Sequence, residues 1–184
     1  MAFLPSLLTK IPHAAGSSSL HRLMRFNNRL FWIAALVSLI CDRLSKVWIL
    51  NNFELGETQP LWSGVFHFTF VTNKGAAFSL FAEQGEWLRW LSLGVSLGLI
   101  ALGTWAARLP RSEQLGYGFI LGGALGNGID RFFRGEVVDF LDFRLIEFPI
   151  FNLADVFINL GIIFLLLTFF VPTSRTKKKD KQDY

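Results

Sequence analysis

The chain has 184 residues and a formal net charge of +4, and 52% of its residues are hydrophobic, slightly above the roughly 45–50% of an average soluble domain. Its one cysteine, Cys41, excludes an internal disulfide framework and a cysteine-rich metal site. The sequence has no Walker or dinucleotide-binding glycine motif and no cluster of histidines at metal-ligand spacing. We therefore expect no cofactor and no metal site built from cysteine or histidine.

Apolar residues are concentrated in four runs, and this distribution is more informative than the overall composition. A helix that spans a bilayer needs roughly 20 mostly apolar residues, and the second and fourth runs reach that length. The first run carries charges near its end, and the third is short unless it continues past Asp130. The four runs cover residues 30–50, 87–107, 115–129 and 151–171.

The second run gives the clearest membrane signal. It carries no charge between Arg89 and Arg108, and Trp87, Trp90 and Trp105 lie near its two ends, where interfacial aromatic belts are found. Together with the other three runs, it predicts a mainly α-helical membrane protein with four transmembrane helices.

Basic residues predict the orientation of these helices. Residues 1–41 contain no acidic residue, the C-terminal tail is rich in lysine, and Arg108 and Arg111 lie between the second and third runs. Because Lys and Arg prefer cytoplasmic loops, we expect both termini and this link in the cytoplasm, with residues 51–86 and 132–150 outside. The net positive charge then reflects membrane topology, and no nucleic-acid partner is needed to explain it.

The domain organisation follows from the same pattern. We expect one four-span domain at residues 30–171, between a cytoplasmic N-terminal tail at 1–29 and a basic cytoplasmic C-terminal tail at 172–184. A cleaved signal peptide is the alternative for the first run. That run is longer than a typical h-region, and Asp42 and Lys46 interrupt it, so we interpret it as the first span.

A short β element is predicted outside the membrane. In residues 65–72, Phe66, Phe68 and Phe70 alternate with His67 and Thr69, which is the period of a strand. The phenylalanines could rest on the lipid surface or pack on a small extracytoplasmic core, and the sequence favours neither.

The third run contains glycine at every fourth position. Gly118, Gly122 and Gly126 share one helix face, and small residues at that spacing allow close helix packing in a bilayer. We therefore interpret these glycines as packing residues without direct chemistry.

Polar residues follow at the end of the third run, and polar groups within membrane spans are costly and often functional. Asn127, Asp130 and Arg131 are separated by three and four residues, so they are expected on one helix face. A structural ion pair between Asp130 and Arg131 explains the last two equally well. Asp42 and Lys46, an i,i+4 pair near the end of the first run, are best interpreted as structural.

More carboxylates precede and open the fourth run. Asn152, Asp155 and Asn159 are expected on one face, while Asp139 and Asp142 lie in the preceding loop, with Asp142 at its surface. By the predicted topology these carboxylates converge near the outer membrane surface. Two kinds of chemistry suit them: metal binding, or activation of water by a dyad that shares one proton because like charges about 3 Å apart cannot both ionise.

Five segments together are typical of one known family. They are residues 42–46 (DRLSK), 73–79 (NKGAAFS), 122–131 (GGALGNGIDR), 135–142 (GEVVDFLD) and 151–158 (FNLADVFI). In these segments and their order, residues 30–171 resemble lipoprotein signal peptidase, also called signal peptidase II. Two departures are minor: Ser45 stands where threonine is more frequent, and the N-terminal tail is longer than the pattern requires.

The resemblance implies an aspartic endopeptidase of the bacterial inner membrane, with four spans and both termini in the cytoplasm. Its substrate would be a prolipoprotein whose cysteine carries diacylglycerol, cut just before that cysteine, with membrane lipids as the other partner. The implied catalytic residues are Asp139 and Asp155, with no metal. Substrate-binding or supporting roles are implied for Asp42, Lys46, Asn73, Gly75, Asn127, Asp130, Arg131 and Asn152. The reactive cysteine belongs to the substrate, and we expect Cys41 to be a packing residue.

Two other classes of function remain as alternatives. A small transporter or channel could use Asp42, Asp130 and Asp155 as an acidic relay, but the inner portions of the second and fourth runs are apolar. A non-enzymatic assembly factor would have no use for Asp139 and Asp155 together. Both rank below the peptidase.

Overall fold

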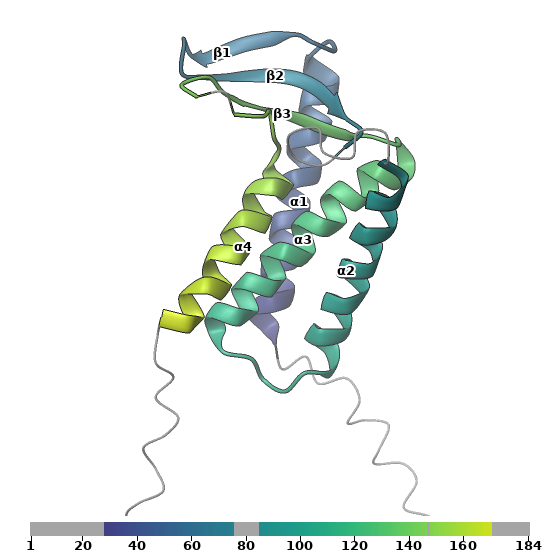
Figure 1. Ribbon diagram of the computed structural model, residues 1–184, viewed down its shortest axis with the longest axis vertical. Helices are drawn as coiled ribbons and strands as arrows, with labels where there is room; N and C mark the ends of the chain where they lie inside the picture. Colours follow the sequence, from purple (N-terminus) through teal and green to yellow (C-terminus); the bar gives the residue numbers. More distant parts are fainter. Residues whose placement is uncertain (1–27, 76–84, 147, 171–184) are drawn as a thin grey trace, which may run out of the picture.

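The computed structural model describes residues 28–75, 85–146 and 148–170. Four long helices lie side by side, and a three-stranded sheet lies across one end of them (Figure 1). The elements in chain order are α1 (Arg29–Asn52), β1 (Thr58–Trp62), β2 (Phe66–Asn73), α2 (Gly85–Trp105), α3 (Arg111–Phe133), β3 (Val137–Phe143) and α4 (Leu153–Phe170). Each predicted apolar run corresponds to one helix, and the short third run does continue past Asp130, to Phe133.

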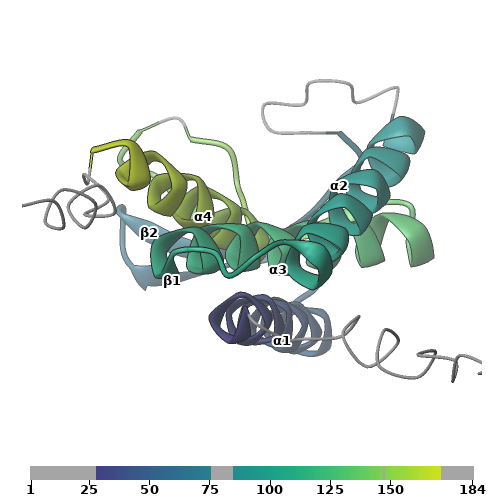
Figure 2. The same ribbon diagram turned by 90° about the horizontal axis from the view of Figure 1, so that it is seen from below.

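Helix α3 is the centre of the helical layer, because it packs against α1, α2 and α4. Figure 2 shows α1 on one side of α3, with α2 and α4 flanking it. The start of α1 and the end of α4 both lie at the end opposite the sheet (Figure 1). The described parts of the two segments predicted to face outward lie at the other end, where the sheet is.

The outer surface of the helices is strongly apolar. Large apolar side chains such as Leu36, Leu44, Leu97 and Leu166 are more than half exposed. Such a surface is unusual for a soluble monomer and typical of an interaction surface. Among the described residues, one helix, Glu86–Trp105, is long and apolar enough to cross a membrane, and Leu153–Thr168 is apolar but shorter.

The predicted close packing of the glycine face is confirmed. A Cβ atom on Gly118 would lie 2.8 Å from the Cβ of Ala34, and one on Gly122 would lie 2.6 Å from the carbonyl oxygen of Ala35. Helices α1 and α3 therefore touch backbone to backbone, and only glycine fits at these positions of α3.

The sheet is antiparallel with the order β1-β2-β3. Its phenylalanines pack on a small core rather than standing free: Phe70 and Phe140 join Ile49 and Phe53 from the end of α1, and Phe68 lies against them. This contact favours the second alternative for the strand predicted at residues 65–72. Gly135, at φ +79°, allows the chain to turn from α3 into β3.

Candidate active site

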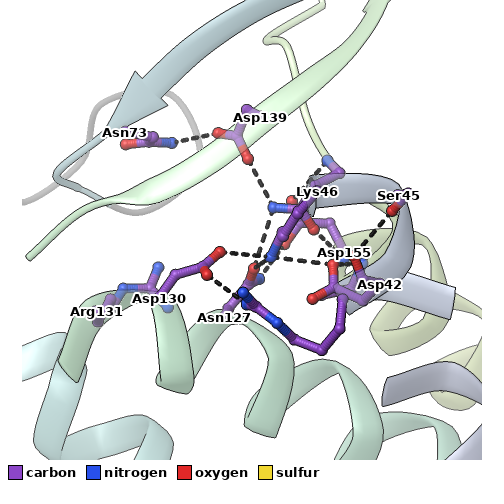
Figure 3. Close-up of polar contacts among 12 residues, drawn as sticks. Asp42, Ser45, Lys46, Asn73, Asn127, Asp130, Arg131, Asp139 and Asp155 are labelled. Atoms are coloured by element: carbon purple, nitrogen blue, oxygen red, sulfur yellow. Dashed lines mark hydrogen bonds and ion pairs between the residues drawn. The ribbon is translucent and has the colours of Figure 1, made fainter. Parts of the chain in front are cut away.

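The two predicted catalytic aspartates come from different elements that meet below the sheet. Asp139 lies in β3, where it pairs in register with Val71 of β2. Asp155 lies in the first turn of α4. Figure 3 shows both side chains in one cluster with Asn73, Asn127 and Lys46.

Asp155 is held by the start of its own helix. The backbone N–H of Asp155 donates to Asn152 Oδ1 at 3.1 Å, and the backbone N–H of Asn152 donates to Asp155 Oδ2 at 3.2 Å. This reciprocal pair is a capping box, with Asn152 as the N-cap and Asp155 three residues later. Asp155 therefore lies at the positive end of the helix dipole of α4.

Asp139 is buried and bonded to two amides. Asn152 Nδ2 donates to Asp139 Oδ1 at 2.6 Å, and Asn73 Nδ2 donates to Asp139 Oδ2 at 3.1 Å. Burial, followed by the negative charge of Asp155, raises the pKa of Asp139 to about 6, against the opposing effect of the two amides. Asp139 is therefore the carboxyl that takes up a proton more readily than an ordinary aspartate.

Asn127 connects the aspartates to a buried cluster of charges. Its Oδ1 accepts from Lys46 Nζ at 2.9 Å and from Asn152 Nδ2 at 3.1 Å, while its Nδ2 donates to Asp155 Oδ1 at 2.8 Å. Both oxygens of Asp155 thus accept hydrogen bonds, one from Asn127 and one from the backbone of Asn152.

The charged cluster joins α1 to α3. Lys46 Nζ lies 3.0 Å from Asp42 Oδ1 and 2.9 Å from Asp130 Oδ2, and all three side chains are fully buried. The predicted pair of Asp42 and Lys46 is confirmed. The alternative pairing of Asp130 with Arg131 is wrong, because Asp130 pairs with Lys46 and Arg43 instead.

Arg131 and Gly75 form another edge of the site. Arg131 Nη2 donates to the carbonyl oxygen of Gly75 at 3.3 Å, and Nη1 reaches Ser92 Oγ at 3.5 Å. The N–H of Gly75 donates to Asn73 Oδ1 at 2.9 Å. Arg131 shares a cavity with Asn127, as their spacing of four residues predicted, whereas Asp130 points away from that cavity to Arg43 and Lys46 of α1.

A cavity of about 420 Å³ opens beside the aspartates. Apolar side chains of α4 and of the segment before it, among them Phe148, Phe151, Ile158 and Ile163, form most of its wall. Its polar lining consists of Asn73, Asn127, Arg131, Asp139, Asp155 and Asn159. Asp42, Lys46 and Asp130 do not line it. Among the described residues no group of three or more His, Cys, Asp and Glu could hold a metal ion.

Two predictions about the surroundings were wrong. Asp142 is not at a loop surface but in β3, where it is 8% exposed. Hydrogen bonds from Thr69 at 2.7 Å and Arg144 at 2.8 Å hold its pKa below the ordinary value, although its burial alone would raise it. Cys41 is exposed on the outside of α1 and not packed in the interior.

Sequence reasoning also missed Arg43 as the partner of Asp130. The only signal was its place inside the 42–46 segment, next to Asp42. Nothing in the local pattern could show that Asp130, 87 residues later, would meet it.

Comparison with known proteins gives a consistent result. A family model described as signal peptidase (SPase) II matches residues 34–171. The lipoprotein signal peptidase of Cyanothece sp. is 60% identical over 162 residues, or 86% of this chain and 94% of that protein. The corresponding protein of Nostoc punctiforme is 62% identical over 153 residues, or 82% of this chain and 97% of that protein.

Solved structures agree with this match. A structure described as a bacterial membrane enzyme solved by the in meso method at 2.3 Å resolution has a TM-score of 0.72 and 28% identity, covering 80% of this chain and 92% of that one. A second of the same description, at 1.9 Å resolution, has a TM-score of 0.68 and 27% identity over 77% and 92% of the two chains.

Proposed function

Since the chain belongs to the signal peptidase (SPase) II family, we propose that Asp139 and Asp155 are its catalytic dyad. Like other members of this family, the chain is an aspartic protease of a bacterial membrane and removes signal peptides from prolipoproteins. Family membership decides against the transporter and assembly-factor alternatives.

One observation carries the assignment of the dyad: Asn152 is bonded to both carboxylates. Its side-chain Nδ2 donates to Asp139 at 2.6 Å, and its backbone N–H donates to Asp155 at 3.2 Å. Both aspartates also line the same cavity. Asp139 is buried, Asp155 is half-buried, and both are held on one residue, so the negative charge of Asp155 disfavours ionisation of Asp139 and we infer that the two share one proton.

In the proposed mechanism Asp139 carries the shared proton and Asp155 is ionised. The raised pKa of Asp139 and the position of Asp155 at the start of α4 support this division. Asp155 removes a proton from a water molecule, whose oxygen attacks the scissile carbonyl carbon, while Asp139 donates its proton to the carbonyl oxygen. Collapse of the tetrahedral intermediate breaks the C–N bond. The proton on Asp155 passes to the leaving amine, and a hydroxyl proton of the intermediate returns to Asp139, so the dyad again holds one proton.

The products are a signal peptide with a new carboxyl terminus and a lipoprotein with a free α-amino group. We propose that the substrate cysteine already carries diacylglycerol and that the cut falls just before it. The apolar wall of the cavity, beside the polar groups of the dyad, supports a substrate with both an acyl chain and a peptide backbone. Asn73, Gly75 and Arg131 are at the cavity edge and have supporting or substrate-binding roles.

The proposal includes the location of the chain. It places four spans in the bacterial inner membrane, with the sheet outside and both termini in the cytoplasm. The clustering of the sheet at one end of the helices and the cation-rich segments at 1–29 and 172–184 support this topology. Residues 30–171 then form the peptidase domain, with membrane lipids as neighbours and without a nucleic-acid partner.

The test is turnover of a diacylglyceryl-modified prolipoprotein by purified variants matched for folded protein. Asp139→Asn and Asp155→Asn keep the size of the side chain but remove its acid–base function. Each should abolish most cleavage, by roughly 10³-fold or more, and the double variant should cost little more, because residues that act as a unit are strongly non-additive.

Asp142→Asn is the matched control, since Asp142 lies on the same strand but bonds to Thr69 and Arg144 rather than to the dyad. It should keep most of the turnover. Near-normal cleavage by Asp139→Asn, with complete loss in Asp130→Asn at full folded yield, would reassign the dyad to Asp130 and Asp155.

A further inference from the structure

We infer that Lys46 is a positioning residue for the dyad, acting through the side-chain amide of Asn127 and without contact to the substrate. This inference rests on the proposed dyad and goes beyond it, because it assigns a specific task to a buried lysine on another helix. The route is short: Lys46 contacts Asn127, and Asn127 contacts Asp155.

Lys46 is enclosed by its own protein partners and is not available to a substrate. An ammonium group has three N–H donors, and three side-chain oxygens surround Nζ at 3.0 Å or less: those of Asp42, Asp130 and Asn127. The side chain of Lys46 is fully buried and does not line the cavity. A role in binding the prolipoprotein directly is therefore excluded by the geometry.

The ammonium of Lys46 fixes which way the amide of Asn127 points. Lysine can only donate, so the atom of Asn127 that faces Nζ must be the carbonyl oxygen. The NH₂ group must then face Asp155, to which it donates at 2.8 Å. A rotated amide would place NH₂ against Nζ and its oxygen against the carboxylate of Asp155, so that both contacts would become repulsive.

The same oxygen of Asn127 also orients the other half of the site. It accepts from Nδ2 of Asn152, which in turn donates to Asp139. One buried positive charge thus selects one arrangement of two amides and, through them, of both carboxylates. Replacement of Lys46 by an apolar residue would remove the shortest of these contacts to the Asn127 oxygen and leave the amide held by Asp155 and Asn152 alone.

The ion cluster around Lys46 also reaches the backbone of α4. Asp42 Oδ1 accepts from the N–H of Ala154 at 3.1 Å, next to Asp155 in the chain. Two cations, Lys46 and Arg43, face two anions, Asp42 and Asp130. Buried ion pairs contribute little net stability compared with apolar packing, and a positioning task explains why such a cluster stands beside the dyad.

The test compares Lys46→Met with Arg43→Met. Both remove a positive charge that pairs with Asp130, but Arg43 does not contact Asn127. Lys46→Met should lower kcat about 100-fold, because misplacement of a catalytic group by about 1 Å can cost that much. KM should change less than about threefold, since Lys46 does not touch the cavity, and Arg43→Met should lower kcat less than about fivefold.

A double-variant cycle separates positioning from structural support. If Lys46 acts through Asn127, the double variant Lys46→Met/Asn127→Ala should have a kcat less than about threefold below that of Asn127→Ala alone. If Lys46→Met folds poorly, the double variant Asp42→Asn/Lys46→Met takes its place. It removes one charge of each sign, so no additional buried charge is left unpaired. The asparagine also keeps an oxygen that can accept from the N–H of Ala154.

Three results would overturn the inference: an equal loss of kcat in Arg43→Met, a loss that appears in KM, or full multiplication of the Lys46 and Asn127 effects. Asp155→Asn belongs in the same series. If Asp155→Asn stays active, the proposed dyad itself fails, whereas an inactive Asp155→Asn with an active Lys46→Met refutes the positioning role alone.

Discussion

Replacement of Gly122 by alanine tests how closely α1 and α3 are packed. An added Cβ would overlap Ser38 Oγ and lie 2.6 Å from the carbonyl oxygen of Ala35. The serine side chain can rotate, but the carbonyl is part of the α1 backbone. Ordinary contact begins at 3.4 Å, so the two helices would have to separate by 3.4 − 2.6 = 0.8 Å at this point.

The expected cost follows from that displacement. Overpacking in a well-packed interior costs typically about 1–3 kcal/mol, and the upper end applies because a backbone atom is the obstacle. Gly98→Ala in α2 is the matched control, since nothing lies within 4 Å of the added Cβ. Both changes bring the same intrinsic helix gain of about 1 kcal/mol, so their difference isolates the packing cost.

The assay is thermal unfolding of the purified variants in one detergent, followed by tryptophan fluorescence. In a protein of this size 1 kcal/mol corresponds to about 2–4 °C, so the Tm of Gly122→Ala should lie about 6–12 °C below that of Gly98→Ala. Turnover should also fall, because separation of α1 from α3 draws Lys46 away from Asn127. Equal melting temperatures for the two variants would refute the close backbone contact.

Three more predictions concern topology, chemistry and pH. In a Cys41-free background, cysteines introduced at positions 108–112 should not be labelled by a membrane-impermeant reagent in intact cells, whereas a cysteine introduced at Glu54 should be labelled. Labelling at 108–112 would contradict the proposed topology. Activity should survive chelators, because amide N–H groups already bond to the oxygens of both proposed catalytic aspartates; loss on chelation with recovery on adding zinc would reject the metal-free dyad. The proton on Asp139 is needed for catalysis and is lost as pH rises through its pKa of about 6, so kcat/KM, which reports the free enzyme, should fall about tenfold per pH unit above that value. A profile that stays flat to pH 9 would rule out Asp139 as the acid.

The sequence predicted the helices well because their signals are local. Runs of apolar residues, glycines four residues apart and the i,i+4 pair of Asp42 and Lys46 each report on one helix face. The capping box of Asn152 and Asp155 is also a local pattern, and it sets the position of one of the two proposed catalytic residues. Such features can be found without knowledge of the partner elements.

The wrong predictions for Asp130 and Asp142 have a common cause: the contacts of each residue are made with elements distant in the chain. Asp130 and Arg131 are consecutive, so their side chains point about 100° apart on a helix and cannot pair easily; Asp130 instead meets α1. The sequence predicts a loop at Asp142 because β3 is covered on both faces and therefore lacks the alternation of a half-exposed strand.

The positions where α1 meets α3 form one ladder with a step of four residues in each helix. Gly118 lies against Ala34, Gly122 against Ser38, Gly126 against Asp42, and Asp130 against Lys46. The side chains contributed by α1 change along this ladder from apolar, through a hydroxyl, to charged. The three glycines set the distance between the helices, and at that distance the side chain of Lys46 reaches both Asp130 and Asn127. The glycine face and the charged cluster are therefore parts of one arrangement, in which packing within the helical layer sets the position of an amide beside the proposed catalytic carboxylates.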